Sequence, residues 1–539
     1  MRLTSMLSCI LPLGSLNVKD SSTILNMLYE CIHSVFSQED ASKPKSNIKS
    51  RDNSVSKQLE ELEQLLKSES IDDDMKNACA AEIENLKVQA TSSKALKAKH
   101  SLELNTAEQV KSFESDPWKF GKNLFNNSKD LSLKCLNEDL TEHYKDIFSK
   151  KFSGKFFPPP VYQPPNPVNA FNMSAITMDD IENFLKDKTK VSAPGPNRIP
   201  YAIWKKCPVL HGYLLHVYND VLSSCKVPTQ WQSGLTVPIP KRIDSQANQT
   251  RPITLTYTDG KFFFSIMASR LDGYLLSNNL IDKRIQKGFA KNIPGCFEHS
   301  SLLLEALSNA AEYKKNICAV FIDLYNAFGS IEHELLPVVC EFFHLPKEFI
   351  TLINSYYSGL SCRLKFPNGQ FSEKVKVEVG LFQGCTLSVY LFLLVFQVLL
   401  NMFKTDKCQK QSYKFNTSAH LSVKDFAFAD DLLLITKSLE GAQYLLKILN
   451  KFAEWSHMEI NPNKSRFLAF KNAKGKYLYV EGKSLKVGKH KICSLKPNEY
   501  YKYLGLNINS KRSVGADQDN LKCILNNGIM RIDSTLLSG

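Results

Sequence analysis

The chain of 539 residues has no Cys-x-x-Cys pair, and none of its 14 cysteines stands with histidines at zinc-finger spacing. This argues against a zinc knuckle; scattered single cysteines are typical of small core side chains in a reducing, intracellular compartment. No apolar run approaches the roughly 20 residues of a membrane-spanning helix, and the apolar segment 390–400 is too short. Residues 1–16 contain one arginine and a short apolar stretch, so they mimic a signal peptide only weakly. We therefore expect a nuclear or cytoplasmic protein without a membrane partner, although no firm localisation signal is present.

The composition is that of a globular protein in which basic residues outnumber acidic ones. Hydrophobic residues make up 43% of the chain, and the formal net charge is +14. The length allows several domains and a sizeable core. A basic balance favours a polyanionic partner such as nucleic acid, with salt-dependent binding, although charge alone would equally suit an acidic membrane surface.

Asp430 and Asp431 stand side by side within an apolar segment, residues 426–435 (FAFADDLLLI). Such a segment predicts two short buried strands joined by a tight turn. A turn of this kind usually contains Asn-Gly or Asp-Gly, because those residues accept a positive φ. Two neighbouring carboxylates repel each other where water is scarce, and a divalent cation would offset that repulsion. The pair therefore predicts a metal site, with a solvated Asp-Asp turn as the alternative.

Asp323 is the candidate for a third carboxylate. It follows residues 317–322 (ICAVFI), whose apolar and β-branched side chains predict a core strand. A carboxylate at the end of such a strand is costly unless it has a partner, and capping of the following helix is the alternative role. If this strand packs beside the hairpin, three carboxylates converge in a constellation that suits two magnesium ions roughly 4 Å apart.

The sequence then resembles a known family, the reverse transcriptases of non-LTR (LINE-type) retrotransposons. The resemblance runs from about residue 177 to residue 506 and rests on short segments in the correct order, each modest alone. These segments are residues 191–200 (VSAPGPNRIP), 236–241 (TVPIPK), 251–255 (RPITL), 286–289 (QKGF), 321–328 (FIDLYNAF), 380–388 (GLFQGCTLS), 428–431 (FADD), 455–465 (WSHMEINPNKS) and 501–505 (YKYLG).

The resemblance implies an RNA-directed DNA polymerase with a two-metal site. Asp323 and Asp430 would hold two Mg²⁺ ions, with Mn²⁺ as an alternative metal, and Asp431 would complete the site. The metals would activate the primer 3′-hydroxyl and neutralise the departing pyrophosphate. The implied partners are an RNA template, a DNA primer and deoxynucleoside triphosphates, whereas the oligomeric state is not implied.

Three basic residues match segments near the nucleotide in this family. Arg251 and Lys241 would face the incoming triphosphate, Arg as a bidentate contact and Lys as a point charge. Lys464 matches a lysine placed near the pyrophosphate. An exposed basic side chain without such a role remains the alternative for each.

Phe328, Gln383 and Gly384 complete the candidate site. An aromatic side chain at Phe328 would stack under the incoming sugar and exclude a 2′-hydroxyl, unless it is an ordinary core phenylalanine. Gly384 would allow backbone to approach a base pair, and the Gln383 amide can donate and accept hydrogen bonds there. The sequence departs from the family at Gly329, where an aspartate is usual, and at Phe382, where Arg or a polar residue is usual.

The expected fold is α+β, a right-hand polymerase with fingers and an antiparallel palm sheet. We expect a helical, partly disordered N-terminal extension over residues 1–155, a Pro-rich linker at 156–168, fingers and palm at 169–508, and an incomplete thumb at 509–539. Neither an endonuclease pattern in residues 1–150 nor an RNase H-like acidic set is found, which favours a copy truncated from a larger element.

Three alternatives remain open from the sequence. The chain could be a catalytically inactive remnant that only binds nucleic acid. It could be an RNA-directed RNA polymerase, which Phe328 and the motif order disfavour. A structural coiled-coil protein is the third, but helical periodicity covers too little of the chain.

Overall fold

The structure is a computed structural model that describes residues 2–11, 16, 20–40, 133–149, 154–186, 193–288, 294–416 and 421–510. The chain divides into two compact units, Met1–Ser34 with Lys129–Asp517, and Val35–Ser128 with Gln518–Gly539. The following description concerns the first unit. Within the expected N-terminal extension, the sequence predicts a short heptad-like helix at residues 55–66 and a second helical stretch at about 72–110, and residues 117–125 resemble a Trp-containing helix of the family. These segments and the partial thumb beyond residue 510 lie outside the described residues.

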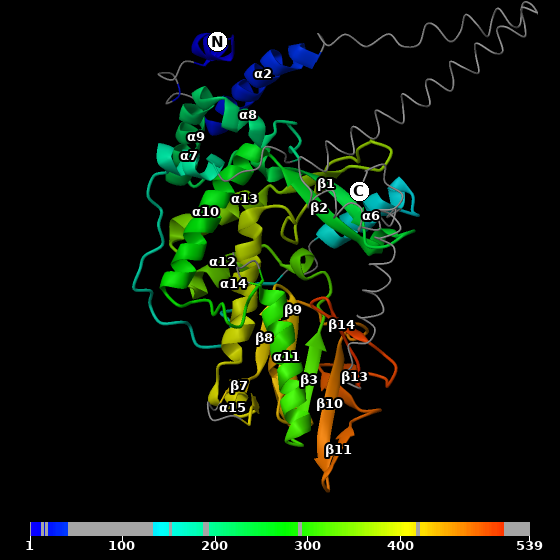
Figure 1. Cartoon of the computed structure of the whole chain (residues 1–539). Coiled ribbons are helices and arrows are strands. Elements are labelled where there is room, and N and C mark those ends of the chain that lie inside the picture. Colours follow the sequence, from blue (N-terminus) through cyan, green and yellow to red (C-terminus); the bar gives the residue numbers. More distant parts are fainter. Residues whose placement is uncertain are drawn as a thin grey trace, which may run out of the picture. The chain divides into compact units, whose positions relative to one another are not determined.

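Helices form much of the described chain (Figure 1). The α-helices are α1 (Arg2–Ile10), α2 (Ser21–Asp40), α6 (Asn137–Phe148), α7 (Met178–Lys186), α8 (Tyr201–Lys206), α9 (His211–Ser224), α10 (Thr258–Ser277), α11 (Gly295–Glu312), α12 (Leu335–Phe342), α13 (Lys347–Ser358), α14 (Thr386–Met402), α15 (Asp406–Gln409) and α16 (Leu439–Ser456). Short 3₁₀ turns are η2 (Pro208–Leu210), η3 (Thr229–Gln232), η4 (Ala247–Gln249) and η5 (Ala327–Ser330). No helix of the described residues is long and apolar enough to cross a membrane.

A four-stranded sheet has the order β2-β1-β4-β5. Its strands are β1 (Ser233–Pro240), β2 (Thr250–Thr256), β4 (Ser361–Leu364) and β5 (Val375–Lys376). β1 pairs antiparallel with β2 and parallel with β4. Side chains alternate between buried and half-buried along most of β1, as expected for a sheet with one covered face.

A seven-stranded sheet has the order β12-β13-β10-β3-β9-β8, with β11 paired to β10. Its strands are β3 (Ile317–Ile322), β8 (Asp425–Phe428), β9 (Asp431–Thr436), β10 (Arg466–Ala473), β11 (Lys476–Tyr479), β12 (Ser484–Val487) and β13 (His490–Ser494). Its pairings are antiparallel except that of β10 with β13. Every residue of β3 is buried, so the prediction of a core strand at residues 317–322 is confirmed.

Helices cover both faces of this sheet. α11 lies over one face beside β3 and β8 (Figure 1), where Leu303 and Leu307 belong to the same core as Ala319 and Phe321. Because side chains alternate along a strand, Cys318 points to the other face, where α16 packs against β3, β9 and β12. The strand that ends directly before Asp323 is therefore covered by helices on both faces.

The apolar run of residues 390–400 predicts a buried helix, and it lies within α14, which is buried over almost its whole length. It packs against α10, α12 and α16, and so supports the seven-stranded sheet from behind the α16 layer. Residues 177–180 have the pattern of a helix start, with Thr177 as the expected N-cap, and α7 begins directly after it. The Thr177 hydroxyl accepts the Asp180 N–H at 3.2 Å, and the Asp180 carboxylate accepts the Thr177 N–H at 2.9 Å.

The Pro-rich segment 156–168 forms neither helix nor strand, as its composition predicts. It is nevertheless fixed along the body of the unit. The Trp455 indole donates to the Phe157 carbonyl at 2.9 Å, and a His344 ring nitrogen lies 2.7 Å from the Pro164 carbonyl. The remaining strand pairs are β6 (Tyr413–Lys414) with β7 (Ser422–Val423) and β14 (Tyr501–Tyr503) with β15 (Leu506–Ile508).

Candidate functional site

The Asp430–Asp431 pair lies at the turn between β8 and β9. Phe428 pairs with Asp431, so Ala429 and Asp430 form a two-residue turn. The prediction of two buried strands and a tight turn is confirmed. Ala429 has a φ of 55°, a conformation that glycine would adopt more readily, and it costs a non-glycine residue about 1 kcal/mol or more.

Asp323 is brought beside this turn by the pairing of β3 with β9. Ile322 lies opposite Leu432, and because the strands are antiparallel, the residue after Ile322, Asp323, lies beside the residue before Leu432, Asp431. Desolvation raises the pKa of the half-buried Asp430; the charge of Asp323 raises it further and that of Arg251 opposes the shift. The side chain of Asp431 reaches solvent, yet the surrounding protein desolvates it. Its pKa rises to about 6 by that desolvation, with the charges of Asp430 and Asp323 adding to the effect.

The three carboxylates form an open set of oxygen donors. Within the described ranges, no group of three or more His, Cys, Asp or Glu side chains is placed so that it could hold a metal ion by itself. Mg²⁺ does not require one, because it keeps several water ligands and is usually bound by one or two carboxylates together with substrate phosphates. The three carboxylates repel one another, and a cation would relieve that repulsion, so they suit Mg²⁺.

Two residues that the sequence reasoning did not single out hold Asp323 in place. The Asn461 amide donates to Asp323 Oδ2 at 2.9 Å, and the Asn461 N–H donates to the Asp323 carbonyl at 2.8 Å. The Asp323 N–H donates to Ser465 Oγ at 3.1 Å. Lys464 Nζ lies 4.0 Å from Asp323 Oδ2 on a largely exposed side chain. Asp323 is thus anchored from the segment just before β10, the strand that pairs with β3.

Lys241 and Arg251 lie at the end of the β1–β2 hairpin. Arg251 pairs with Ile239, and the Lys241 N–H donates to the Gln249 carbonyl at 2.9 Å. Partial burial lowers the pKa of Lys241, and the positive charges of Lys464 and Arg251 lower it further, while Asp323 acts in the opposite direction. These basic side chains therefore lie within electrostatic range of one another and of the carboxylates.

Gln383 and Gly384 are docked on β2 rather than on the carboxylates. The Thr254 N–H donates to the Gln383 carbonyl at 2.8 Å. Gly384 has a φ of 141°, and a Cβ on it would lie 2.2 Å from the Thr254 carbonyl oxygen. Phe382 is 3% exposed and lies near Gly234 of β1, so an apolar residue suits this position where the family usually has a polar one.

Phe328 is half-buried and stacks on Phe392 of α14, with ring centroids 4.3 Å apart. Its carbonyl accepts the Leu381 N–H at 2.8 Å, which connects it to the loop that carries Gln383. A Cβ on Gly329 would lie 2.2 Å from the Asn326 side-chain nitrogen. Asn326 occupies the space that the usual aspartate would need, so this departure is accommodated locally.

β14 packs beside the carboxylates. The ring of Tyr501 stacks on Phe321 of β3 with centroids 4.4 Å apart. Burial raises the pKa of Tyr501, and the charges of Asp431 and Asp323 raise it further. The segment 501–505, which closed the order of motifs in the sequence, therefore borders the same site.

Comparison with known proteins gives a consistent result. Residues 239–508 match the family described as reverse transcriptase (RNA-dependent DNA polymerase). The chain is 28% identical over 337 residues to the Retrovirus-related Pol polyprotein from type-2 retrotransposable element R2DM of Drosophila melanogaster; the match covers 62% of this chain and 30% of that protein. It is 26% identical over 338 residues to the corresponding polyprotein from type-1 element R2 of Nasonia vitripennis, covering 62% of this chain and 31% of the relative. The chain thus spans about a third of the length of these relatives.

Proposed function

Because the chain belongs to the reverse transcriptase (RNA-dependent DNA polymerase) family, within the non-LTR retrotransposon polymerases, we propose that it copies RNA into DNA by nucleotidyl transfer. The observation that carries the proposal is that Asp323, Asp430 and Asp431 lie together within electrostatic range of the basic side chains of Arg251 and Lys241. Nucleotidyl transfer needs a negative side for cations and a positive side for a triphosphate, and both are present here.

The proposed mechanism assigns a task to each side of the site. Asp323, Asp430 and Asp431 would hold two Mg²⁺ ions, which when bound supply Lewis-acid stabilisation of the reacting oxygens. Arg251 and Lys241 bind and orient the triphosphate of the incoming nucleotide, so that its α-phosphorus lies in line with the primer 3′-oxygen. The hydroxyl proton leaves to solvent and the O–P bond to the new nucleotide forms as the bond to pyrophosphate breaks.

Phe328 supports a preference for deoxynucleotides. Its ring is held by Phe392, and a fixed aromatic ring beside the sugar would leave no room for a 2′-hydroxyl. Gln383 and Gly384 would contact the nascent pair, because Gly384 brings backbone close to β2, the strand that also carries Arg251. In this assignment the four-stranded sheet belongs to the fingers and the seven-stranded sheet is the palm. We assign residues 169–508 to the fingers and palm together and residues 156–168 to the linker before them.

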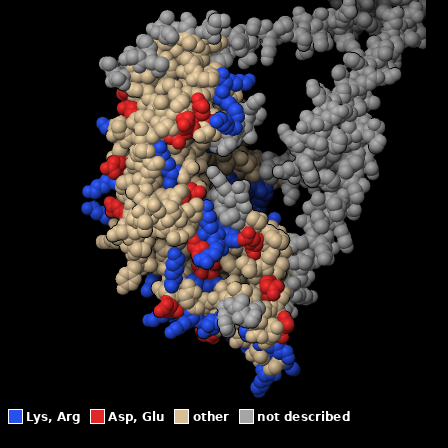
Figure 2. Space-filling view, turned by 60° about the vertical axis from the view of Figure 1, so that its left-hand side comes forward, with Lys and Arg blue, Asp and Glu red and all other residues tan. Residues whose placement is uncertain are grey.

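A basic surface supports nucleic acid as the partner. Between residues 466 and 502 only Glu481 and Glu499 are acidic, and Glu499 is paired with Arg466 at 2.9 Å. The exposed lysines of this region, which we call the lysine surface, are Lys471, Lys474, Lys476, Lys483, Lys486, Lys489, Lys491, Lys496 and Lys502. Figure 2 shows Lys and Arg at the lower end of the molecule, where the β10–β11 turn lies in Figure 1. Such a surface attracts a phosphate backbone over a distance of about 10 Å at moderate salt.

Primer extension on an RNA template with the purified chain tests the proposal. We expect Mg²⁺-dependent incorporation of deoxynucleotides that the double change Asp430→Asn, Asp431→Asn abolishes. Asp179→Asn on α7, which removes an exposed carboxylate, should leave activity unchanged. Salt-dependent binding of primer-template without any incorporation, under conditions where a related polymerase works, would contradict the proposed activity and identify a binding protein instead.

A further inference from the structure

A buried glutamine forms hydrogen bonds to the strained turn that carries the carboxylates. Gln286 is 3% exposed. Its side-chain oxygen accepts the Ala429 N–H at 2.9 Å, and its side-chain nitrogen donates to the Ala429 carbonyl at 3.1 Å. One amide thus satisfies both backbone groups of the residue with the positive φ, directly before Asp430.

The backbone around Gln286 is itself fixed to the sheet. The Ala427 N–H donates to the Ile285 carbonyl at 2.9 Å, and the Lys287 N–H donates to the Ala427 carbonyl at 2.9 Å. Residues 285–287 therefore extend the β8 edge by a short parallel bridge. Lys287 is almost fully buried and forms an ion pair with Glu298 of α11, which ties this segment to the helix layer.

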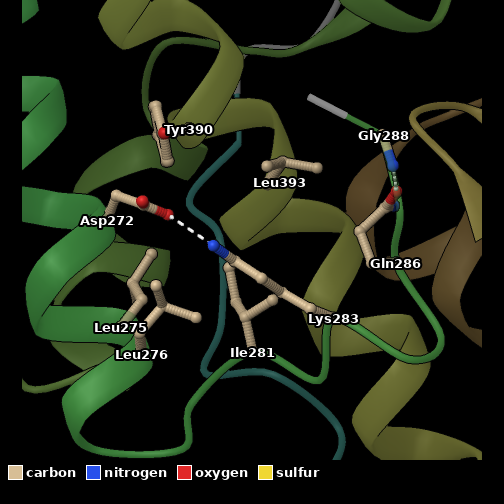
Figure 3. Close-up of a pocket in the computed structure, with 9 residues that line it drawn as sticks. All are labelled: Asp272, Leu275, Leu276, Ile281, Lys283, Gln286, Gly288, Tyr390 and Leu393. Carbon is tan, nitrogen blue, oxygen red and sulfur yellow. Dashed lines mark hydrogen bonds and ion pairs between the residues drawn. The ribbon is translucent and has the colours of Figure 1, made fainter. Parts of the chain in front are cut away.

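Gly288 completes the arrangement. Its N–H donates to the same Gln286 oxygen at 2.9 Å, so the oxygen accepts two hydrogen bonds. A Cβ on Gly288 would lie 2.1 Å from the Ala429 nitrogen, so only glycine permits this approach. Figure 3 shows the Gln286 amide turned toward the Gly288 backbone, while Lys283 points to Asp272. The space beside Gln286 is a small pocket, so hydrogen bonds rather than tight packing on that side fix its orientation.

We propose that Gln286 is a positioning residue for the carboxylate site: its amide holds the Ala429 peptide in the strained turn, and thereby fixes the backbone from which Asp430 and Asp431 project. The inference rests on the proposed function, because it assigns to that site the residue that shapes it. An amide suits the task since it donates and accepts at once and adds no charge beside three carboxylates. Residues that orient metal ligands typically alter metal affinity or activity by about 10- to 100-fold when they are changed.

The test compares Gln286→Met with a matched control. Met keeps the length and volume of the side chain but loses all three hydrogen bonds. Gln397 on α14 is 1% exposed and donates to Asn401 at 3.0 Å, so Gln397→Met removes a buried amide elsewhere. We expect Gln286→Met to weaken Mn²⁺ binding by about tenfold, measured by electron paramagnetic resonance without substrates, and to speed amide hydrogen exchange in residues 428–432 by a similar factor. Gln397→Met should change neither quantity.

A double-variant cycle separates positioning from packing. Glycine adopts a positive φ readily, so in the Ala429→Gly variant the turn should depend much less on the hydrogen bonds from Gln286. Gln286→Met should therefore weaken Mn²⁺ binding less in the Ala429→Gly background than in the natural one, and the double variant should fold even if the single variant does not. Equal losses in both backgrounds, equal losses from Gln286→Met and Gln397→Met, or no loss from Gln286→Met would each overturn the inference.

Primer extension distinguishes this inference from the proposed function. If the unchanged chain extends a primer, Gln286→Met should lower kcat about tenfold or more, while the KM for the deoxynucleotide changes little. The reason is that Gln286 positions the turn with the carboxylates and not the side chains that bind the triphosphate. If the unchanged chain does not extend a primer, the proposed function fails, whereas metal binding and exchange still decide the role of Gln286.

Discussion

Gly384→Ala should lower the free energy of unfolding more than the same change at another glycine with a positive φ. Gly384 has a φ of 141°, and its added Cβ would lie 2.2 Å from the Thr254 carbonyl oxygen. That oxygen belongs to β2, so it cannot move without disturbing the pairing of β1 with β2. Gly369 is the matched control, since its φ is 84° but a Cβ there meets nothing within 4 Å.

The expected magnitude follows from two contributions. A non-glycine residue in either conformation is strained by about 1 to 3 kcal/mol, and this applies to both variants. At Gly384 the loop must also move away from β2, which would break the 2.8 Å hydrogen bond from the Thr254 N–H to the Gln383 carbonyl. A lost hydrogen bond of this kind costs about 1 kcal/mol, and displaced packing of the buried Phe382 adds to it. We therefore expect the free energy of unfolding to fall by about 2 kcal/mol more for Gly384→Ala than for Gly369→Ala.

Urea titration of the two variants measures the difference, and primer extension measures its consequence. The KM for primer-template should rise in Gly384→Ala, because the displaced loop no longer holds Gln383 against Ile253 and Thr254 of β2. Equal losses of stability in the two variants would show that the close approach to Thr254 has no energetic role. An unchanged KM despite lower stability would remove Gln383 and Gly384 from the binding surface.

Other parts of the structure give further expectations. His299 is fully buried, and desolvation lowers its pKa to about 4. In the unfolded chain the same side chain has a pKa near 6.5. The free energy of unfolding should therefore not depend on this group above pH 6.5, and should fall by about 3 kcal/mol as the pH decreases toward 4. His299→Phe should flatten that part of the unfolding free-energy curve, and an unchanged pH profile would contradict the assignment. Phe328→Val should admit ribonucleotides in a dNTP-versus-NTP comparison, and unaltered sugar selectivity would leave Phe328 as a core residue only. Changing Lys474, Lys476 and Lys483 to Gln should lower the slope of log affinity against log salt by about 1 to 2 without altering Mn²⁺ binding, whereas an identical slope would place the nucleic acid elsewhere.

The elements of the seven-stranded sheet that local sequence determines could be predicted. The buried strand at residues 317–322, the hairpin around Asp430 and the helix at residues 390–400 all appear in the structure. Each depends on an apolar pattern within about ten residues, which records burial directly. The convergence of Asp323 with the hairpin needed a further assumption, that β3 and β9 are neighbours, and the resemblance to a family supplied it.

The residues that hold the carboxylates in place could not be found in this way. Asn461 and Ser465 reach Asp323 because β10 pairs with β3 across more than 100 residues of sequence. Gln286 reaches Ala429 from a segment 143 residues away. Hydrogen bonds from a side chain to a distant backbone group leave no periodic pattern, so the sequence showed only that segments with these residues occur in order. Gly329 and Phe382 illustrate the converse, since departures in sequence proved to be matched by Asn326 and by a buried position.

The two groups of hydrogen bonds share a physical logic. Asn461 holds Asp323, and Gln286 holds the residue before Asp430; both are neutral amides that donate and accept at the same time. A lysine or arginine in either place would neutralise a carboxylate and compete with a cation for it. A further carboxylate would add to the repulsion that, together with the larger effect of desolvation, raises the pKa of Asp431 to about 6. Neutral amides fix the geometry and leave the negative charge of the three aspartates uncompensated by the groups that hold their backbone. The charge that remains is what a divalent cation requires, so the choice of amides at these positions supports the same function as the aspartates themselves.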